Sequence, residues 1–333
     1  MDGEQGKQTG KSASLSLSRT EHERRIGEKL RRELGPQICE LLEDPTVIEI
    51  MLNPNGRLWV ERLGEPMVPI GAMSASQAES LMGTVASTLR TQITAANPIL
   101  ECELPLDGSR FEAMIPPVVS GPTFTLRKKA IRIFTLDDYV ESQIMTQAQC
   151  DGIKAAVRNR RNVLVVGGTG TGKTTLTNAI IRYMAEAAPQ DRIAIIEDTG
   201  ELQCTAENAV QMRAVDHVDM TRLLKATMRL RPDRILVGEV RDGAALALLK
   251  AWNTGHPGGA ATVHANSAPA GLIRMEQLVA EATPAPMQTL IAEAVDLVVS
   301  IAKIAHVGRR IKEVVTVEGH DGTNYITKPL GET

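Results

Sequence analysis

One stretch of this sequence has the residue types and spacing of a phosphate-binding loop. Residues 165–181 read VVGGTGTGKTTLTNAII, in which a glycine-rich turn separates an apolar run from a helix-like segment. The turn satisfies the pattern GxxxxGK[ST], whose glycines let backbone N–H groups approach phosphate oxygens. The N-terminus of the following helix adds a partial positive charge at the same place. The stretch therefore predicts a site for a nucleotide polyphosphate.

Each position of this loop has an expected role. Lys173 should reach the β- and γ-phosphates and Thr174 should bind Mg²⁺, so ATP and Mg²⁺ are the predicted ligands. The other predicted nucleotide-binding residues are Gly167, Gly168, Thr169, Gly170, Thr171, Gly172 and Thr175. The alternative, a glycine-rich turn that binds nothing, is disfavoured by the complete pattern between a strand and a helix.

Acidic side chains follow two other apolar runs, in RILVGEVRDG and IAIIEDTGEL. Glu239 ends the first run, where it can hold Mg²⁺ through water or polarise the attacking water. Glu197 and Asp198 end the second. Such an acid is often only a loop residue or a helix cap, but two such strands beside a phosphate loop favour a functional site. We predict catalytic roles for Glu239 and Glu197, and metal contacts from Asp198 and Glu239.

Two of the six histidines lie in the segment NTGHPGGAATVHANS. His256 occupies a Gly/Pro turn and His264 follows an apolar run, and ordinary structural roles suit either residue alone. The segment offers no third ligand, which argues against a metal site. A strand end beside the nucleotide would let His264 sense the γ-phosphate, so His264 is a candidate catalytic residue.

Patterning divides the rest of the chain into a tail and two domains. Residues 1–18 are polar and predict a disordered tail. Residues 19–132 predict a small α+β domain, with a helix from Thr20 and a hairpin over 47–61 that turns at Asn-Pro-Asn-Gly. A second helix and three strands should complete it, near 74–91, 99–104, 109–115 and 123–128.

A linker is expected over residues 133–145, followed by an α/β domain over 146–333. In this second domain, uniformly apolar runs alternate with helices of 10 to 15 residues, as a mostly parallel sheet requires. The four predicted buried strands are 162–166, 192–196, 234–238 and 259–263.

Composition narrows the classes of function. The 333 residues carry a formal net charge of −3 and only 2% aromatics, which argues against direct DNA binding. The four cysteines form no CxxC pair, so no zinc ribbon is predicted. The N-terminus has no apolar signal segment and no run is long enough to span a bilayer, so a cytoplasmic location without an integral membrane segment is expected.

Four segments in this order resemble the secretion ATPases of the type II/type IV secretion superfamily. GGTGTGKTT is similar to their Walker A loop, IEDTGEL to the Asp box, RPDRILVGEVRDG to the Walker B region and TGHPGGAATVHANS to the His box. The spacing and the lack of a tetracysteine insert most resemble the VirB11 branch, and within it the TrbB-type proteins of conjugative plasmid transfer. The similarity extends over about residues 40–320. Gly-Glu ends the Walker B strand in place of an Asp, which leaves the direct magnesium ligand open.

The resemblance implies a RecA-like P-loop NTPase domain, preceded by a small α+β domain, in a homo-oligomeric ring that is a hexamer. It also implies that Arg110 in LDGSRFEAM and Arg127 in FTLRKK reach nucleotide phosphates, although solvated strand arginines are an equal alternative. The expected function is ATP hydrolysis that powers assembly of, or substrate transfer through, a conjugative type IV secretion apparatus. Inner-membrane components of that apparatus are the expected partners, with the chain in the cytoplasm or peripherally at the inner membrane.

Four alternatives stay open at this point. A type IV pilus extension or retraction motor would use the same four segments. A nucleic-acid motor is disfavoured by the acidic balance and the scarcity of aromatics. An ATP-gated binding module is disfavoured by the acids at the strand ends, and a small-molecule kinase by the lack of a recognisable lid or acceptor pocket.

Overall fold

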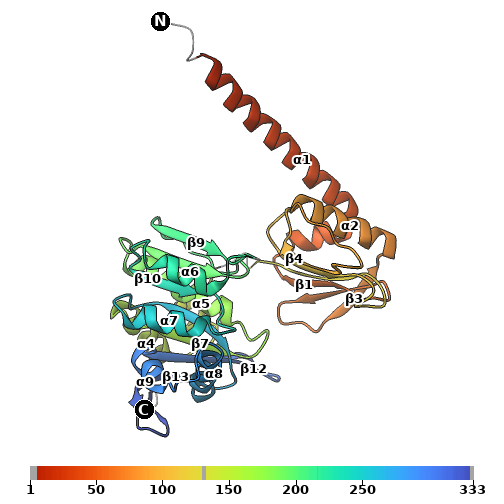
Figure 1. Ribbon diagram of the computed structural model, residues 1–333. Helices are drawn as coiled ribbons and strands as arrows, with labels where there is room; N and C mark the ends of the chain where they lie inside the picture. Colours follow the sequence, from red (N-terminus) through yellow and green to blue (C-terminus); the bar gives the residue numbers. More distant parts are fainter. Residues whose placement is uncertain (1–5, 130–132, 216, 331–333) are drawn as a thin grey trace, which may run out of the picture. The chain divides into compact units, whose positions relative to one another are not determined.

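The chain divides into two compact units, Met1–Ile131 and Arg132–Thr333. The structure is a computed structural model that describes the backbone of residues 6–129, 133–215 and 217–330, with side chains described for residue 21 and from residue 24 onward within these ranges (Figure 1).

The first unit is built on a six-stranded antiparallel sheet in the order β3-β2-β1-β6-β5-β4. Its elements are α1 (Gly6–Glu43), β1 (Val47–Leu52), β2 (Arg57–Arg62), β3 (Val68–Ala72), α2 (Ala75–Thr88), β4 (Ile99–Glu103), β5 (Arg110–Met114) and β6 (Thr123–Arg127). The predicted hairpin is β1–β2, and Gly56 in its turn has a φ of 78° that few other residues tolerate. Strand β3 was not predicted.

Helix α1 is longer than the sequence indicates. It begins at Gly6 rather than Thr20 and changes direction at Gly35, whose φ is 80°. Residues 6–18, predicted as part of a disordered tail, therefore continue the helix, because extending an existing helix costs much less than nucleating one. Residues 1–5 of that tail lie outside the described residues.

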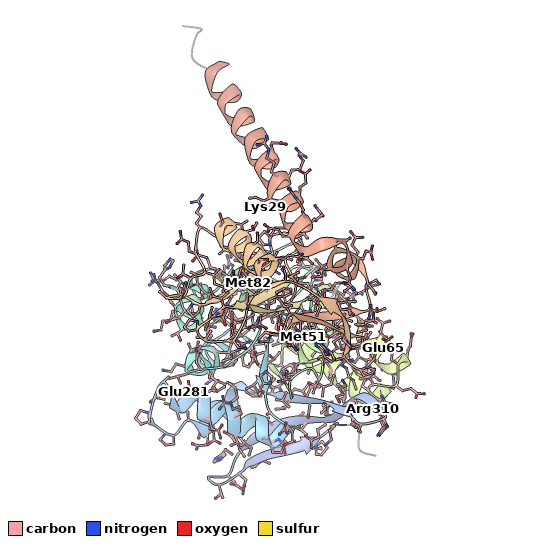
Figure 2. All side chains as sticks on the ribbon, turned by 90° about the vertical axis from the view of Figure 1, so that its right-hand side faces the viewer. Lys29, Met51, Glu65, Met82, Glu281 and Arg310 are labelled. Atoms are coloured by element: carbon pink, nitrogen blue, oxygen red, sulfur yellow. The ribbon has the colours of Figure 1, made fainter. Side chains whose placement is uncertain are left out.

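Apolar side chains of α1 and α2 share a core with one face of this sheet. Leu34 of α1 and Met82 of α2 are almost completely buried in it. Figure 2 labels Met82 on α2. Side chains alternate between the two faces along each strand, so that Phe111 and Leu126 face this core. The residues beside them, which include Arg110 and Arg127, face the opposite side of the sheet.

The second unit is built on an eight-stranded sheet in the order β14-β13-β12-β7-β11-β10-β8-β9. Its strands are β7 (Val163–Gly167), β8 (Ile193–Glu197), β9 (Ala209–Arg213), β10 (Arg234–Val237), β11 (Ala260–His264), β12 (Leu297–Ile304), β13 (Gly308–His320) and β14 (Tyr325–Pro329). All pairs from β12 to β9 are parallel, and β13 and β14 add antiparallel strands at one edge. The four strands predicted from apolar runs are the adjacent strands β7, β11, β10 and β8.

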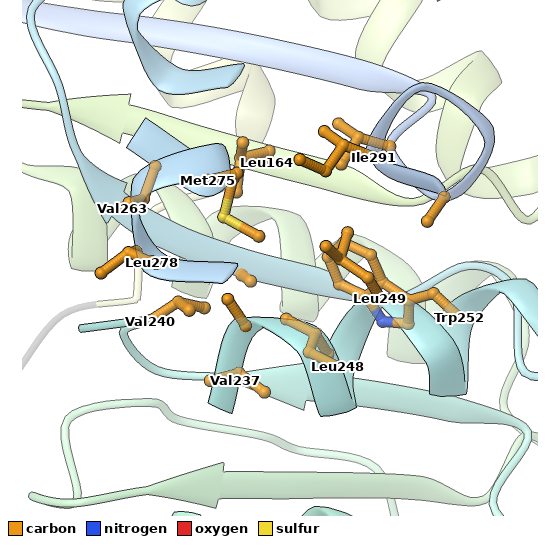
Figure 3. Close-up of a cluster of buried hydrophobic side chains, with 14 of the residues drawn as sticks. Leu164, Val237, Val240, Leu248, Leu249, Trp252, Val263, Met275, Leu278 and Ile291 are labelled. Carbon is orange, nitrogen blue, oxygen red and sulfur yellow. The ribbon is translucent and has the colours of Figure 1, made fainter. Parts of the chain in front are cut away.

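Helices cover both faces of this sheet (Figures 1 and 3). One core contains side chains of α3 (Leu136–Glu141), α4 (Gln147–Arg158) and α5 (Lys173–Ala187). The other contains side chains of α6 (Met220–Thr227), α7 (Ala244–Asn253), α8 (Ala268–Ala280) and α9 (Gln288–Ala294). In Figure 3, Trp252 of α7 and Met275 of α8 pack in this second core together with Leu164 and Val263 of the sheet.

The segment predicted as a linker, 133–145, is instead part of the second unit. It contains α3, which begins with a capping box between Thr135 and Asp138. Leu136 and Tyr139 are at most 4% exposed in the core beside α4 and α5. Burying these side chains in the core is more favourable than exposing them to water. This burial stabilises the segment as a helix of the second unit.

Candidate functional site

Four neighbouring parallel strands end at one edge of the sheet of the second unit. Their last residues are Gly167 of β7, His264 of β11, Val237 of β10 and Glu197 of β8. The pairing aligns these ends, since His264 lies beside Gly167 and Val237 beside Ile196. Ligands of open α/β sheets bind outside this edge. The sequence-predicted site residues of the second unit all lie here, whereas His256 precedes β11 and lies at the opposite edge.

The loop between β7 and α5 has the backbone of a phosphate cradle. Gly170 and Gly172 have φ values of 69° and 99°, which favour glycine strongly. A Cβ at Gly167 would lie 2.5 Å from the carbonyl oxygen of Ile301, so no side chain fits there. The Thr171 hydroxyl donates to the carbonyl oxygen of Gly168 at 2.9 Å and closes the turn. Backbone N–H groups of a glycine-rich turn at a helix N-terminus can point at phosphate oxygens, so this cradle suits a nucleotide polyphosphate.

Lys173, His264 and Glu239 form a line of contacts from the loop to the next strands. Lys173 Nζ donates to the carbonyl oxygen of Gly168 at 3.0 Å and lies 3.2 Å from His264 Nδ1. His264 Nε2 lies 2.7 Å from Glu239 Oε1. The pKa of His264 is lowered, mainly by burial of the ring and further by the positive charge of Lys173. A neutral His264 therefore accepts from Lys173 at Nδ1, while its Nε2 lies close to Glu239 Oε1, an oxygen that has no hydrogen-bond partner among the described residues.

Arg241 joins the two acidic strand ends. Its guanidinium lies 2.6 Å from Glu239 Oε2 and 2.6 Å from Asp198 Oδ2. Asp198, a predicted metal ligand, also accepts from the backbone N–H of Thr199. In this structure the Asp198 carboxylate is therefore occupied by Arg241 and its own loop.

Glu201 also lies in the site, although it was not among the residues predicted from the sequence. Thr174 Oγ1 donates to Glu201 Oε2 at 3.0 Å, which joins the predicted magnesium threonine to a carboxylate. Glu201 is the last acid of IEDTGEL, in the loop after the strand, where position in the sequence alone does not place its carboxylate beside Thr174. Hydroxyl and carboxylate oxygens are the ligand types that Mg²⁺ takes in proteins.

Glu197 holds the loop that follows β8 and contains Glu201. Its side chain is 3% exposed, and Oε1 accepts from the backbone N–H groups of Glu201 and Leu202 at 2.9 and 2.7 Å. A Cβ at Gly238 would come within 2.9 Å of Glu197 Cγ, so only glycine there leaves room for the carboxyl. Burial raises the pKa of Glu197 to about 7, and the two N–H donors reduce the rise. Glu197 therefore positions Glu201.

Arg110 and Arg127 lie in the first unit, on β5 and β6, so the structure does not bring them together with the loop within one compact unit. A third arginine, Arg309 of β13, contacts the loop at Gly170. Nothing in its sequence spacing, more than a hundred residues after the loop, identifies it. The contact depends on the pairing of β12 with β7.

Comparisons with known proteins show the family of this chain. The sequence profile of a family described as Type II/IV secretion system protein matches residues 33–324. The chain belongs to this family. As a Type II/IV secretion system protein, it is 56% identical over 304 residues to the conjugal transfer protein TrbB of Rhizobium radiobacter, which covers 91% of this chain and 94% of that protein.

Two further similarities extend the comparison. The chain is 32% identical over 286 residues to the type IV secretion system protein VirB11 of Bartonella henselae, covering 73% of this chain and 79% of that protein. A solved structure of the pilus retraction motor PilT with bound ADP matches with a TM-score of 0.60 at 19% identity, covering 89% of this chain and 82% of that one. The second similarity is one of fold alone. The predicted family and fold class of this secretion system protein are confirmed.

Proposed function

We propose that this chain is an ATP hydrolase that powers a conjugative type IV secretion apparatus. The observation that carries the proposal is the line of contacts from Lys173 through His264 to Glu239. Nucleotide binding alone needs the loop and its lysine, whereas turnover also needs a carboxylate close by to orient or deprotonate water. The 56% identity to a conjugal transfer protein favours conjugation over a pilus motor, which is supported only by a likeness of fold.

In the proposed reaction, backbone N–H groups of the loop and Lys173 hold the β- and γ-phosphates. Lys173 exchanges its contacts with Gly168 and His264 for phosphate oxygens when the nucleotide enters. Glu239 orients the attacking water and accepts its proton, while a bond forms between the water oxygen and the γ-phosphorus. The bond from that phosphorus to the bridging oxygen breaks, and ADP and phosphate leave.

The residues present suit Mg²⁺ bound together with a nucleotide. Among the described residues, no group of three or more His, Cys, Asp or Glu side chains is arranged to hold a metal ion by itself. An ion here would therefore share its ligands with phosphate and water, as Mg²⁺ does in nucleotide sites. Thr174 and Glu201 would hold it directly, with Glu239 acting through water, and Asp198 only after release from Arg241. When bound, the ion neutralises charge on the polyphosphate.

The proposal includes a homo-hexameric ring. In it, Arg110 and Arg127 of the first unit would complete nucleotide sites. It also includes inner-membrane components of the apparatus as partners and a cytoplasmic position. None of the helices within the described residues is both long and apolar enough to cross a bilayer.

A ligand that binds only the assembled form shifts assembly by mass action, so ATP should increase the sedimentation coefficient. A monomer with full activity at all concentrations would contradict the ring.

The decisive experiment is ATP turnover by the purified full chain, with no acceptor molecule and no nucleic acid. We expect steady release of phosphate that Lys173→Ala abolishes while the thermal unfolding midpoint stays close to that of the unmodified chain. Turnover without an acceptor would exclude a small-molecule kinase, and binding without turnover would indicate an ATP-gated module. Turnover that requires DNA, with salt-dependent DNA affinity, would instead indicate a nucleic-acid motor.

A further inference from the structure

The β12–β13 hairpin extends past the edge of the sheet beside the phosphate loop. The pairing of β12 with β7 ends where Ser300 lies beside Val166, yet β12 continues to Ile304. At about 3.3 Å per strand residue, the four extra residues carry the hairpin roughly 13 Å beyond the last pair. Strand β13 then returns alongside β12 and brings Arg309 back next to the loop.

Arg309 packs against the phosphate loop. Its Nη2 donates to the carbonyl oxygen of Gly170 at 3.3 Å. A Cβ at Gly172 would lie 3.3 Å from both Cδ and Nε of Arg309, so the arginine stem crosses the residue that caps α5. Arg309 thus contacts both glycines whose positive φ values give the loop its shape.

The position of Arg309 concentrates positive charge. It lies at the N-terminus of α5, which carries a partial positive charge, and Lys173 is the first residue of that helix. Lys303 lies directly opposite Arg309 across the hairpin. Like charges directly opposite on paired strands destabilise a sheet. A polyphosphate in the loop would offset these charges together.

We infer that Arg309 is a positioning residue of the nucleotide site, acting within its own chain. Through the Gly170 carbonyl it holds the loop tip in the shape that receives a nucleoside di- or triphosphate. The inference rests on the proposed function. Without Arg309 the loop is looser before nucleotide arrives, so affinity falls. The chemical step, which depends on Glu239, keeps its rate once the nucleotide is bound.

The first test separates affinity from turnover in Arg309→Ala. We expect KM for ATP and Kd for ADP to rise about 10- to 100-fold, as for loss of a hydrogen bond to a charged group, with kcat changed by less than about threefold. Affinity for AMP should stay the same, because the loop grips the β- and γ-phosphates. Arg309→Lys keeps the charge but loses the planar fork, and should recover part of the affinity.

Lys312→Ala is the matched control, since Lys312 is an exposed cation on the same strand. It removes the same charge and should leave KM and Kd unchanged. An unchanged KM in Arg309→Ala, or an equal rise in Lys312→Ala, would overturn the inference. The thermal unfolding midpoint of each variant is measured as well. If Arg309→Ala does not fold, the affinities of Arg309→Lys are compared with those of the unmodified chain instead. ADP affinity tests Arg309 even if the chain proves not to hydrolyse ATP.

The second test asks which chain Arg309 serves. Arg309→Ala and Lys173→Ala subunits are mixed into the same rings and assayed at ATP concentrations far below the raised KM. If Arg309 acts within its own chain, no site has both groups and the mixed rings recover no activity. Recovery would assign Arg309 to a neighbouring subunit's site and overturn the inference.

Discussion

Arg110 and Arg127 lie directly opposite one another on the paired strands β5 and β6. Opposite residues on antiparallel strands have Cβ atoms about 5 Å apart, and like charges in this relationship repel. Acids flank the pair, because Glu103 lies opposite Arg110 on β4 and Glu49 lies opposite Arg127 on β1. This row of four charged residues places two arginines side by side, so that a single polyphosphate can contact both.

If either arginine completes a nucleotide site, its replacement by alanine should lower kcat by roughly 10³-fold or more, about 4 kcal/mol of barrier. ATP affinity should change little. Steady-state turnover and nucleotide binding of Arg110→Ala and Arg127→Ala measure this. Unaltered kcat in both variants would show that the pair is only a solvated part of the sheet.

Mixing Arg127→Ala with Lys173→Ala subunits tests whether the arginine serves a neighbour. Mixed rings then contain some interfaces with both groups intact, and part of the activity should return. Rings shown by mass spectrometry to be mixed, yet inactive, would assign Arg127 to its own subunit or require all sites to act together. The recovery expected for Arg127 is the opposite of the result expected for Arg309, for which no activity should return.

Glu239→Gln should bind ATP but lose turnover by about 10²- to 10⁴-fold, because the amide keeps the shape of the side chain but accepts no proton. Phosphate release and nucleotide affinity are measured on the same preparation. Glu281→Gln removes an exposed glutamate at the end of α8 and is the control. A collapse of ATP affinity in Glu239→Gln would make Glu239 mainly a magnesium-site residue.

Glu201→Gln should raise the Mg²⁺ concentration needed for half-maximal turnover, since a neutral amide is a weaker magnesium ligand than a carboxylate. Nucleotide affinity in the presence of EDTA should stay unchanged. Titration of activity with Mg²⁺ checks this, with Glu207→Gln, an exposed glutamate of the same loop, as the control. Identical Mg²⁺ curves for Glu201→Gln and the unmodified chain would remove Glu201 from the proposed metal site.

Glu197 should make the second unit less stable as pH rises. Its pKa is about 7 in the folded chain and 4.5 ordinarily, so between these values the unfolded chain loses a proton that the folded chain keeps. The free energy of unfolding should therefore fall by about 3 kcal/mol from pH 4.5 to pH 7 and then level off. Glu197→Gln removes this titration. Denaturant unfolding across that range compares the two slopes, and equal slopes would contradict the prediction.

Much of the second unit could be predicted because buried parallel strands are uniformly apolar. The runs that became β7, β8, β10 and β11 are buried on both faces, whereas β9 and β14 are partly exposed edge strands and have no comparable signal. The pattern GxxxxGK[ST] likewise fixes a local conformation, so the loop could be identified from sequence. The α3 helix was missed because six residues give too little periodicity.

Side-chain directions in the site could not be predicted in the same way. Position alone puts Glu197 at a strand end, but whether its carboxyl faces water or the protein depends on the space that Gly238 leaves. Glu201 reaches Thr174 only after its loop has folded back onto Glu197. Arg309 reaches Gly170 only because β12 pairs with β7 and then continues past it.

The two neighbours of β7 in the sheet are β11 and β12, which come roughly a hundred residues or more later in the chain. During synthesis the strand before the phosphate loop therefore emerges without either partner. At about 5 to 20 residues per second, its partners follow on the order of ten seconds later. The sheet pairing on both sides of the phosphate-loop strand is therefore complete only after β12 has left the ribosome, late in synthesis. A chain truncated before Leu297 lacks β12, and with it the Ile301 contact at Gly167 and the hairpin that brings Arg309 to the loop.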